Sequence, residues 1–155
     1  MAAGDLLTDV PWSHEVNDAT VGTASDPWSV LDCVGWLGDD IASQDAPFDL
    51  VDGAAAGVDT VSPKVITLTL GFEAAPGATD EEAEAAAVLA GFALSAQFTA
   101  GGDVELHGIL RGGGHVYLTG RCRGARETTV AEIPWGQLIM QATFVATNPV
   151  VQVVP

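Results

Sequence analysis

The stretch from Thr79 to Phe98 reads TDEEAEAAAVLAGFALSAQF, and it predicts the helix around which the rest of the fold is arranged. Thr79 and Glu82 have the spacing of a capping box, in which each side chain accepts a hydrogen bond from the other residue's backbone N–H. Acidic residues fill the first turn, where the helix dipole favours negative charge. Gly91 weakens a helix by about 1 kcal/mol relative to alanine, so it indicates either a weak point or a close approach by a neighbouring element.

Strands lie on both sides of this helix in the sequence. They alternate apolar and polar residues, which is typical of a strand with one buried face. Runs of strands around a single helix favour an α+β, mainly β fold, namely a β-sandwich or split barrel with one helix packed on it. The predicted strands are residues 28–37, 64–73, 104–110, 115–126 and 137–147, and a glycine-rich hairpin turn at 111–114 joins the third strand to the fourth.

The chain of 155 residues is long enough for one domain, or for one domain with an arm. Residues 1–24 are predicted to form an N-terminal extended arm or edge strand. Residues 25–155 are predicted to form the β-sandwich domain, with the helix at about 79–98 and a small-residue, acidic loop at about 44–62. A chain of this size can bury roughly 68–70% of the surface of its unfolded state, which is enough for a core of its own.

The beginning of the sequence lacks the basic and apolar regions of a signal peptide, and no run of 18 apolar residues predicts a membrane span. Cys33 and Cys122 are the only cysteines. Without an export signal, two isolated cysteines are interpreted as free thiols and not as a disulfide.

Charge is distributed very unevenly along the chain. The 21 acidic residues outweigh the five basic ones, which gives a net charge of −16. Residues 1–63 contain twelve acids and no lysine or arginine, whereas the four arginines all lie between Arg111 and Arg126. An acidic surface repels phosphate, so a role in gripping DNA or RNA is disfavoured. Solubility alone is the simpler explanation of the excess.

No pattern of residues indicates catalysis. A Gly-x-Ser-x-Gly elbow is absent, and the glycines at 112–114 lack the Lys-Ser/Thr of a phosphate loop. His107 and His115 could face each other across the hairpin, with Glu105 nearby, but metal clusters usually have tighter ligand spacing. The sequence therefore predicts no enzyme, catalytic residue, metal or cofactor. A small receptor- or carbohydrate-binding β-sandwich, with tryptophans as the platform, stays open as an alternative.

Three segments carry a resemblance to a known family. They are the strand PKVITLTL at 63–70 before the helix, the arginine-bearing strand YLTGRCR at 117–123, and the closing ATNP at 146–149. Together, over about residues 25–151, they resemble the N-terminal domain of distal tail proteins of long-tailed bacteriophages. Many members carry a second, C-terminal domain beyond the length of this chain, and the loop at 44–62 lacks the usual Gly/Arg-rich character. A tail-tube or tail-completion protein is therefore the alternative within this class.

The resemblance implies a structural protein of the virion, made in the host cytoplasm and not associated with a membrane. It implies a homo-oligomeric ring, most simply a hexamer, that joins the tail-tube protein to the hub or tip proteins of the baseplate. DNA would pass through the lumen without specific binding, which agrees with the acidic charge. Arginines of one subunit would meet the acidic N-terminal half of the next, and the subunit-interface candidates are Arg121, Arg123, Arg126, Trp28 and Trp36.

Overall fold

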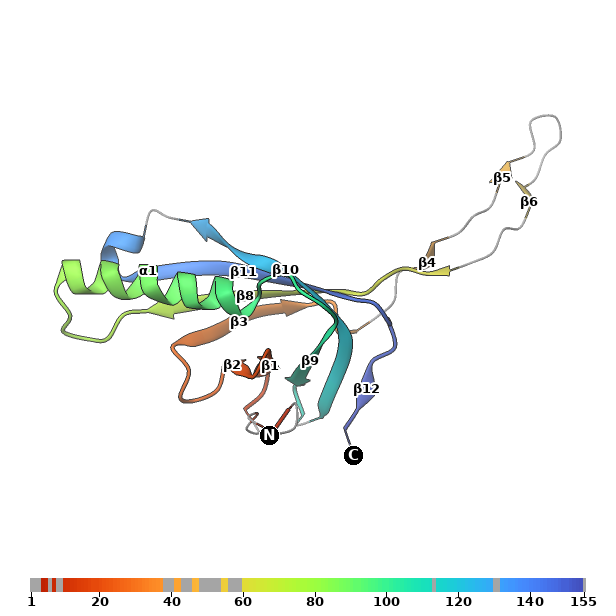
Figure 1. The fold of residues 1–155 in the computed structure, drawn as a ribbon, viewed down its shortest axis with the longest axis horizontal. Coiled ribbons are helices and arrows are strands. Elements are labelled where there is room, and N and C mark those ends of the chain that lie inside the picture. The colour runs from red at the N-terminus through yellow and green to blue at the C-terminus, as the bar shows by residue number, and fades with distance from the viewer. Residues whose placement is uncertain are drawn as a thin grey trace.

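Antiparallel strands make up most of the molecule, and a single long helix packs beside them (Figure 1). The computed structural model describes residues 4–5, 7, 10–37, 41–42, 46–47, 54–55, 60–112, 114–129 and 132–154. Within these residues, one unclosed sheet of eight strands has the order β2-β1-β9-β10-β11-β8-β3, and β12 pairs with β10. Its strands are β1 (His14–Val16), β2 (Ala19–Val21), β3 (Trp28–Val34), β8 (Val65–Glu73), β9 (Val104–Ile109), β10 (His115–Thr129), β11 (Gln137–Ala146) and β12 (Gln152–Val153).

Strand β10 divides the sheet into two halves because it changes partners along its length. Residues 115–120 pair with β9, and residues 120–129 pair with β11. Gly120 is the joint, since it lies opposite Val104 of β9 and Ala146 of β11. We call β11, β8, β3 and residues 120–129 of β10 the helix-covered half. The hairpin half consists of β1, β2, β9 and residues 115–120 of β10.

The helix α1 (Asp80–Gln97) begins and ends as the sequence predicts. Thr79 Oγ1 accepts a hydrogen bond from the Glu82 backbone N–H, and Glu82 Oε2 accepts one from the Thr79 N–H, so the capping box forms. The buried face of α1 is made of small residues with Leu94, and Phe98 follows it. At Gly91, a Cβ atom would lie 3.0 Å from the Leu138 side chain of β11. The glycine therefore marks the close approach between helix and sheet.

One apolar core lies between the two halves and the helix. It takes every second residue of each long strand, as period-2 alternation requires. Large side chains such as Phe98, Phe144 and Leu118 are fully buried in it. The predicted class, mainly β with one packed helix, is confirmed. Cys33 and Cys122 are free thiols, as expected, and burial raises the pKa of Cys33 to about 12.

Residues 14–21 form a hairpin inside the fold, where the sequence predicted an arm or edge strand for 1–24. β1 pairs with β2 on one side and with β9 on the other, so of the two hairpin strands only β2 is an edge of the described sheet. Asn17 and Asp18 both have positive φ, 52° and 58°, which is the conformation of a two-residue type I′ turn. The sequence interpretation overlooked this Asn-Asp signal because each strand has only three residues. Residues 1–3, 6, 8 and 9 lie outside the described part of the chain.

Part of the predicted loop at 44–62 pairs as short antiparallel ladders instead. β5 (Ala46–Pro47) pairs with β6 (Ala54–Ala55), and β4 (Ile41–Ala42) pairs with β7 (Thr60–Val61). Figure 1 shows these ladders beyond the N-terminal end of β8, on the opposite side of the sheet from the start of α1. The rest of the predicted loop falls outside the described residues.

Candidate assembly surface

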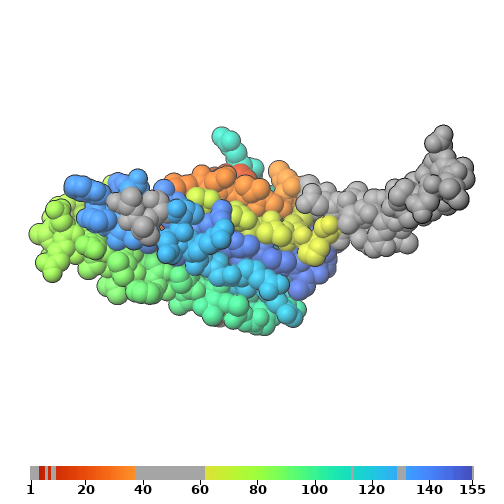
Figure 2. Space-filling view, turned by 90° about the horizontal axis from the view of Figure 1, so that it is seen from above, coloured from red at the N-terminus to blue at the C-terminus, as the bar shows by residue number. Residues whose placement is uncertain are grey.

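The helix-covered half turns one face of its sheet away from the core, and this outer face is our candidate functional surface. Figure 2 shows β3, β8, β11 and β10 crossing it in that order. Its centre is uncharged and rich in threonine and glutamine, and the arginines lie on its β10 side. The central residues are Thr67 and Thr69 of β8, and Gln141 and Thr143 of β11.

Both edges of this half lack a strand partner among the described residues. β3 pairs with β8 alone, and residues 121–129 of β10 pair with β11 alone. A few edge groups are occupied: the Gly22 N–H donates to the Trp28 carbonyl at 3.1 Å, and Ser95 Oγ donates to the Ala125 carbonyl at 3.5 Å. Open edges are templates for pairing with another strand, so natural proteins usually cover or protect them.

The arginines gather on the β10 side of the outer face. Arg121 pairs with Val145 and Arg126 with Gln141, both of which are outward residues of β11. Strict alternation along one strand would place Arg126 on the opposite face from Arg121, but the two share the outer face. A β-bulge between Cys122 and Ala125 inserts an extra residue into β10 and reverses the alternation beyond it.

Each arginine has a different local environment. Arg121 Nε donates to Asp103 Oδ1 at 2.8 Å, and this carboxylate raises the pKa of the exposed guanidinium above its usual value. Arg126 Nη2 donates a longer bond to Gln141 Oε1 at 3.4 Å. Arg123 and Arg126 line one shallow groove of about 280 Å³ beside the bulge. The bulge residue Gly124 has a φ of +99°, which favours glycine at this position.

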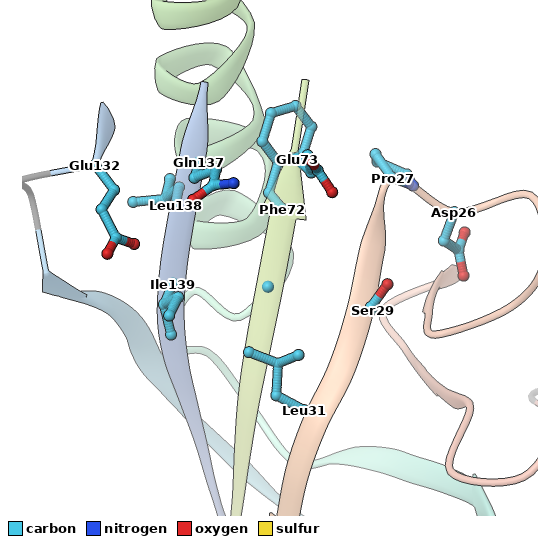
Figure 3. A pocket seen from close by; sticks show the side chains of 11 residues that line it. Asp26, Pro27, Ser29, Leu31, Phe72, Glu73, Glu132, Gln137, Leu138 and Ile139 are labelled. Carbon is cyan, nitrogen blue, oxygen red and sulfur yellow. The ribbon is translucent and has the colours of Figure 1, made fainter. Parts of the chain in front are cut away.

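An acidic groove lies across one end of β3, β8 and β11, and it extends from Asp26 next to β3 to Glu132 next to β11 (Figure 3). Its volume is about 410 Å³, and Asp26, Glu73 and Glu132 surround a floor that includes Leu31 and Ile139. Asp26 is held in place because its carboxylate accepts hydrogen bonds from the Thr20 and Thr23 side chains and from the Thr23 N–H. No lysine or arginine lines this groove. Sequence reasoning missed it because its residues come from four separated segments.

Apolar side chains are exposed along the β3 edge. Leu31 and Val34 of β3 are 56% and 59% exposed, and Val65 of β8 is 46% exposed. Leu31 and Val34 belong to the edge strand itself. The β3 side therefore combines a free edge, exposed apolar groups and carboxylates, whereas the β10 side combines a free edge with guanidinium groups.

Trp28 and Trp36, which the sequence put forward as subunit-interface candidates, lie in the protomer's own core. Trp28 is 4% exposed and packs against Phe72 with ring centroids 5.6 Å apart. Trp36 is 3% exposed, and its Nε1–H donates to His14 Nε2 at 3.0 Å. Both indoles are thus buried by residues of this same chain, and the exposed tryptophan is Trp135.

The structure brings together the histidines that the sequence considered as metal ligands. His107 Nδ1 lies 3.0 Å from His115 Nε2, and His107 Nε2 lies 3.0 Å from Glu105 Oε2. Within the described part of the chain, however, no three His, Cys, Asp or Glu side chains form a group that could hold a metal ion. Nor does any helix described in the structure combine the length and apolar character needed to cross a membrane.

Two solved phage structures share this fold. SPP1 Dit, described as a paradigm of the hub adsorption apparatus in phages that infect Gram-positive bacteria, matches with a TM-score of 0.66 and 12% identity over 90% of this chain. A chain of the phage p2 baseplate in its activated conformation with Sr matches with a TM-score of 0.54 and 12% identity over 89% of this chain. The matches cover 51% and 44% of those chains, so this chain spans about half their length.

No protein-family model and no curated protein matches the sequence. The fold similarity nevertheless confirms the predicted resemblance to distal tail proteins at the level of architecture.

Proposed function

We propose that this protein is a structural, non-enzymatic component of a bacteriophage tail, a distal-tail-type ring that joins the tail tube to the tip or baseplate. The observation that carries the proposal is the shared fold with SPP1 Dit and the p2 baseplate chain. The alternative within the same class is a tail-tube or tail-completion protein, which would have the same kind of sheet.

The outer surface of the helix-covered half supports assembly into a ring. A ring needs heterologous contacts, in which one patch of each subunit meets a different patch of the next. The β10 edge with Arg123 and Arg126 and the β3 edge with Asp26 are two such patches, opposite in charge and at the two edges of the helix-covered half. Contact between them would cover both open edges and the exposed Leu31 and Val34.

We propose six subunits per ring, by analogy of fold, with DNA passing through the lumen. The proposed neighbours are the tail-tube protein on one side and hub or tip proteins on the other, and the assembled location is the virion. A net charge of −16 would repel the phosphates of passing DNA. The uncharged Thr and Gln residues at the centre of the outer face offer no cation to hold them.

Native mass spectrometry with negative-stain imaging tests this proposal. The wild-type protein, concentrated in solution, is expected to form rings with a central hole. Arg126→Glu should shift the population toward monomers, whereas the matched control Arg111→Glu, in the turn between β9 and β10, should not. Adding Glu73→Arg to Arg126→Glu should restore rings by reversing both charges. Tubes of stacked rings would favour the tail-tube alternative.

Two outcomes would contradict the proposal. A wild-type chain that stays monomeric at high concentration and does not bind other tail proteins would favour the small binding module. Rings that form equally well with Arg126→Glu would retain the tail assignment but reject the contact between the β10 and β3 edges.

A further inference from the structure

A second cluster of titratable groups lies on the hairpin half, away from the proposed subunit contacts. Glu15 of β1, His107 of β9 and Tyr117 of β10 lie side by side across three strands. His107 is 4% exposed and stacks on Tyr117 with ring centroids 5.0 Å apart and an interplanar angle of 14°. His115 reaches the same spot from the start of β10, with Nε2 at 3.0 Å from His107 Nδ1.

The chain near its N-terminus lies directly on this cluster. The Gly4 N–H donates to Glu15 Oε1 at 2.8 Å. A Cβ atom at Gly4 would lie 2.7 Å from His107 Nδ1 and 3.0 Å from His115 Nε2, so the backbone of Gly4 passes immediately over the contact between the two imidazoles. Its φ of +88° also favours glycine. Gly4 therefore packs against both rings, and a shift of either ring changes this packing.

The hydrogen-bond network assigns the protons of the pair. Glu105 Oε2 can only accept, as a carboxylate, so His107 Nε2 carries the proton in that bond. Neutral His107 then has an unprotonated Nδ1, which accepts the hydrogen bond from His115 Nε2–H. One proton therefore lies between the two facing nitrogens. The pair can take up one proton at His115 Nδ1 and keep this bond. A further proton at His107 Nδ1 would place two N–H groups of two positively charged rings face to face at 3.0 Å.

We propose that the His107–His115 pair is a proton-operated latch, which holds the N-terminal segment at Gly4 on the sheet while the imidazoles share one hydrogen bond and releases it when both are protonated. His107 is buried and fixed by Tyr117 and Glu105, whereas His115 is only half-buried. His115 is therefore the ring that swings away. Its movement breaks the packing against Gly4 and uncovers the face of β9 and β10.

The charges around the pair set the direction of the response. Burial, followed by the neighbouring His107, lowers the pKa of His115 below its usual value, and Glu15 opposes this shift. The closed state therefore resists the second proton, and the latch opens as the pH falls below about 6.5, the ordinary value for histidine. Other titratable groups near the pair are Glu15, Glu105, Tyr117 and Asp5. Asp18 and Asp103 line the adjoining groove with Glu15 and Glu105, and Asp103 pairs with Arg121.

Only histidines ordinarily change charge between pH 5 and 7.5, since carboxyl groups titrate near 4 and phenols near 10. His14 of β1 lies on the opposite face, in the core, and burial lowers its pKa to about 4. Its protonation therefore occurs below the pH range of the latch. Because release requires both imidazoles to be protonated, it takes up two protons from the neutral pair, and the ratio of open to closed states should change by up to about a hundredfold per pH unit.

Nuclear magnetic resonance of the full-length, ¹⁵N-glycine-labelled protein tests the latch from pH 7.5 to pH 5. The Gly4 amide should move to the shift and relaxation rate of a mobile segment as the pH falls, while the Gly22 and Gly136 amides of the folded body should not. His115→Gln keeps a side-chain N–H donor that cannot take up a proton, so Gly4 should remain docked at pH 5. The matched control Arg111→Gln, in the adjacent turn, should titrate like the wild type.

Two results would overturn the latch. One is a Gly4 amide that does not change while ¹³C-labelled His115 titrates in the same sample. The other is the same pH-dependent release in His115→Gln as in the wild type. Both readouts concern Gly4 and His115 within a single chain, so they are independent of ring formation.

Discussion

The helix-covered half and the hairpin half of the sheet differ in what they bury. Under the helix, the core is apolar and closely packed, with Leu138 of β11 directly against Gly91. In the hairpin half, His14 is buried and accepts a hydrogen bond from Trp36, and Glu15 and His107 are also nearly inaccessible. The first half is therefore held mainly by packing, whereas the second also depends on the protonation state of its side chains.

The largest expected effect comes from breaking the joint between the halves. Gly120→Ala would place a Cβ atom 2.2 Å from the Val145 carbonyl oxygen and 2.6 Å from the Ala146 Cα. These are backbone atoms of the central strand β11, so they cannot move aside as a side chain could. We expect a loss of more than about 4 kcal/mol in the free energy of unfolding, at the extreme for a single substitution.

Urea denaturation of the purified variant measures this loss. Gly101→Ala is the matched control, because a Cβ at that position meets no atom within 4 Å, and its effect should stay within about 0.5 kcal/mol. A Gly120→Ala variant as stable as the control would mean that the two halves do not depend on a close approach at residue 120.

The second effect separates the halves by pH. Burial lowers the pKa of His14 from 6.5 to about 4 in the folded protein. The unfolded chain therefore binds this proton first, and folding stability falls as the pH drops from about 6.5 to about 4. Between pH 7 and pH 4.5 the loss should be roughly 2–3 kcal/mol. Comparison with His14→Gln, which can still accept the Trp36 N–H, isolates this contribution from those of other titrating groups.

The measurement is urea unfolding of both proteins at the two pH values. The wild type should lose more stability on acidification than His14→Gln does. Equal losses in the two proteins would show that His14 does not remain neutral in the folded hairpin half.

The difference between the halves also explains what the sequence could predict. Long alternating strands and an alanine-rich helix depend on local periodicity, so β8, β11 and α1 were located almost to the residue. The hairpin half depends on three-residue strands and on buried polar groups such as His14 and Glu15, which resemble turn and surface residues in sequence.

The same limit applies to the candidate surface. The arginine cluster was predicted, but one bulge changed the face of Arg126, and bulges leave only a faint signal such as Gly124. The tryptophans were interpreted from their chemistry alone, and tertiary packing placed both in the core. The acidic groove was beyond prediction because its carboxylates meet only after folding.

A third, smaller effect concerns packing in the helix-covered half. Gly91→Val adds a β-branched side chain where even a Cβ lies 3.0 Å from Leu138 and 3.5 Å from Met140 Sδ. Overpacking of this kind destabilises by about 1–3 kcal/mol. Ala93→Val is the control on the exposed side of α1, where it should lose only about 0.7 kcal/mol or less from helix propensity. Thermal unfolding at pH 7 compares them, and similar losses would mean that the helix is not pressed against β11.

The smallest effect tests the exposed end of the same helix. Thr79→Ala removes the hydroxyl that accepts the Glu82 N–H at 3.3 Å but leaves the bond from the Thr79 N–H to the Glu82 carboxylate at 2.9 Å. We expect a loss of about 1 kcal/mol in the free energy of unfolding, whereas Thr79→Ser should keep the stability of the wild type.

The hydrogen bond from the Thr79 backbone N–H is the main cause of the lowered pKa of Glu82. Because it survives in Thr79→Ala, the carboxyl should still titrate below its ordinary value. A normal pKa for Glu82 in Thr79→Ala would instead mean that the hydroxyl holds the whole capping box together.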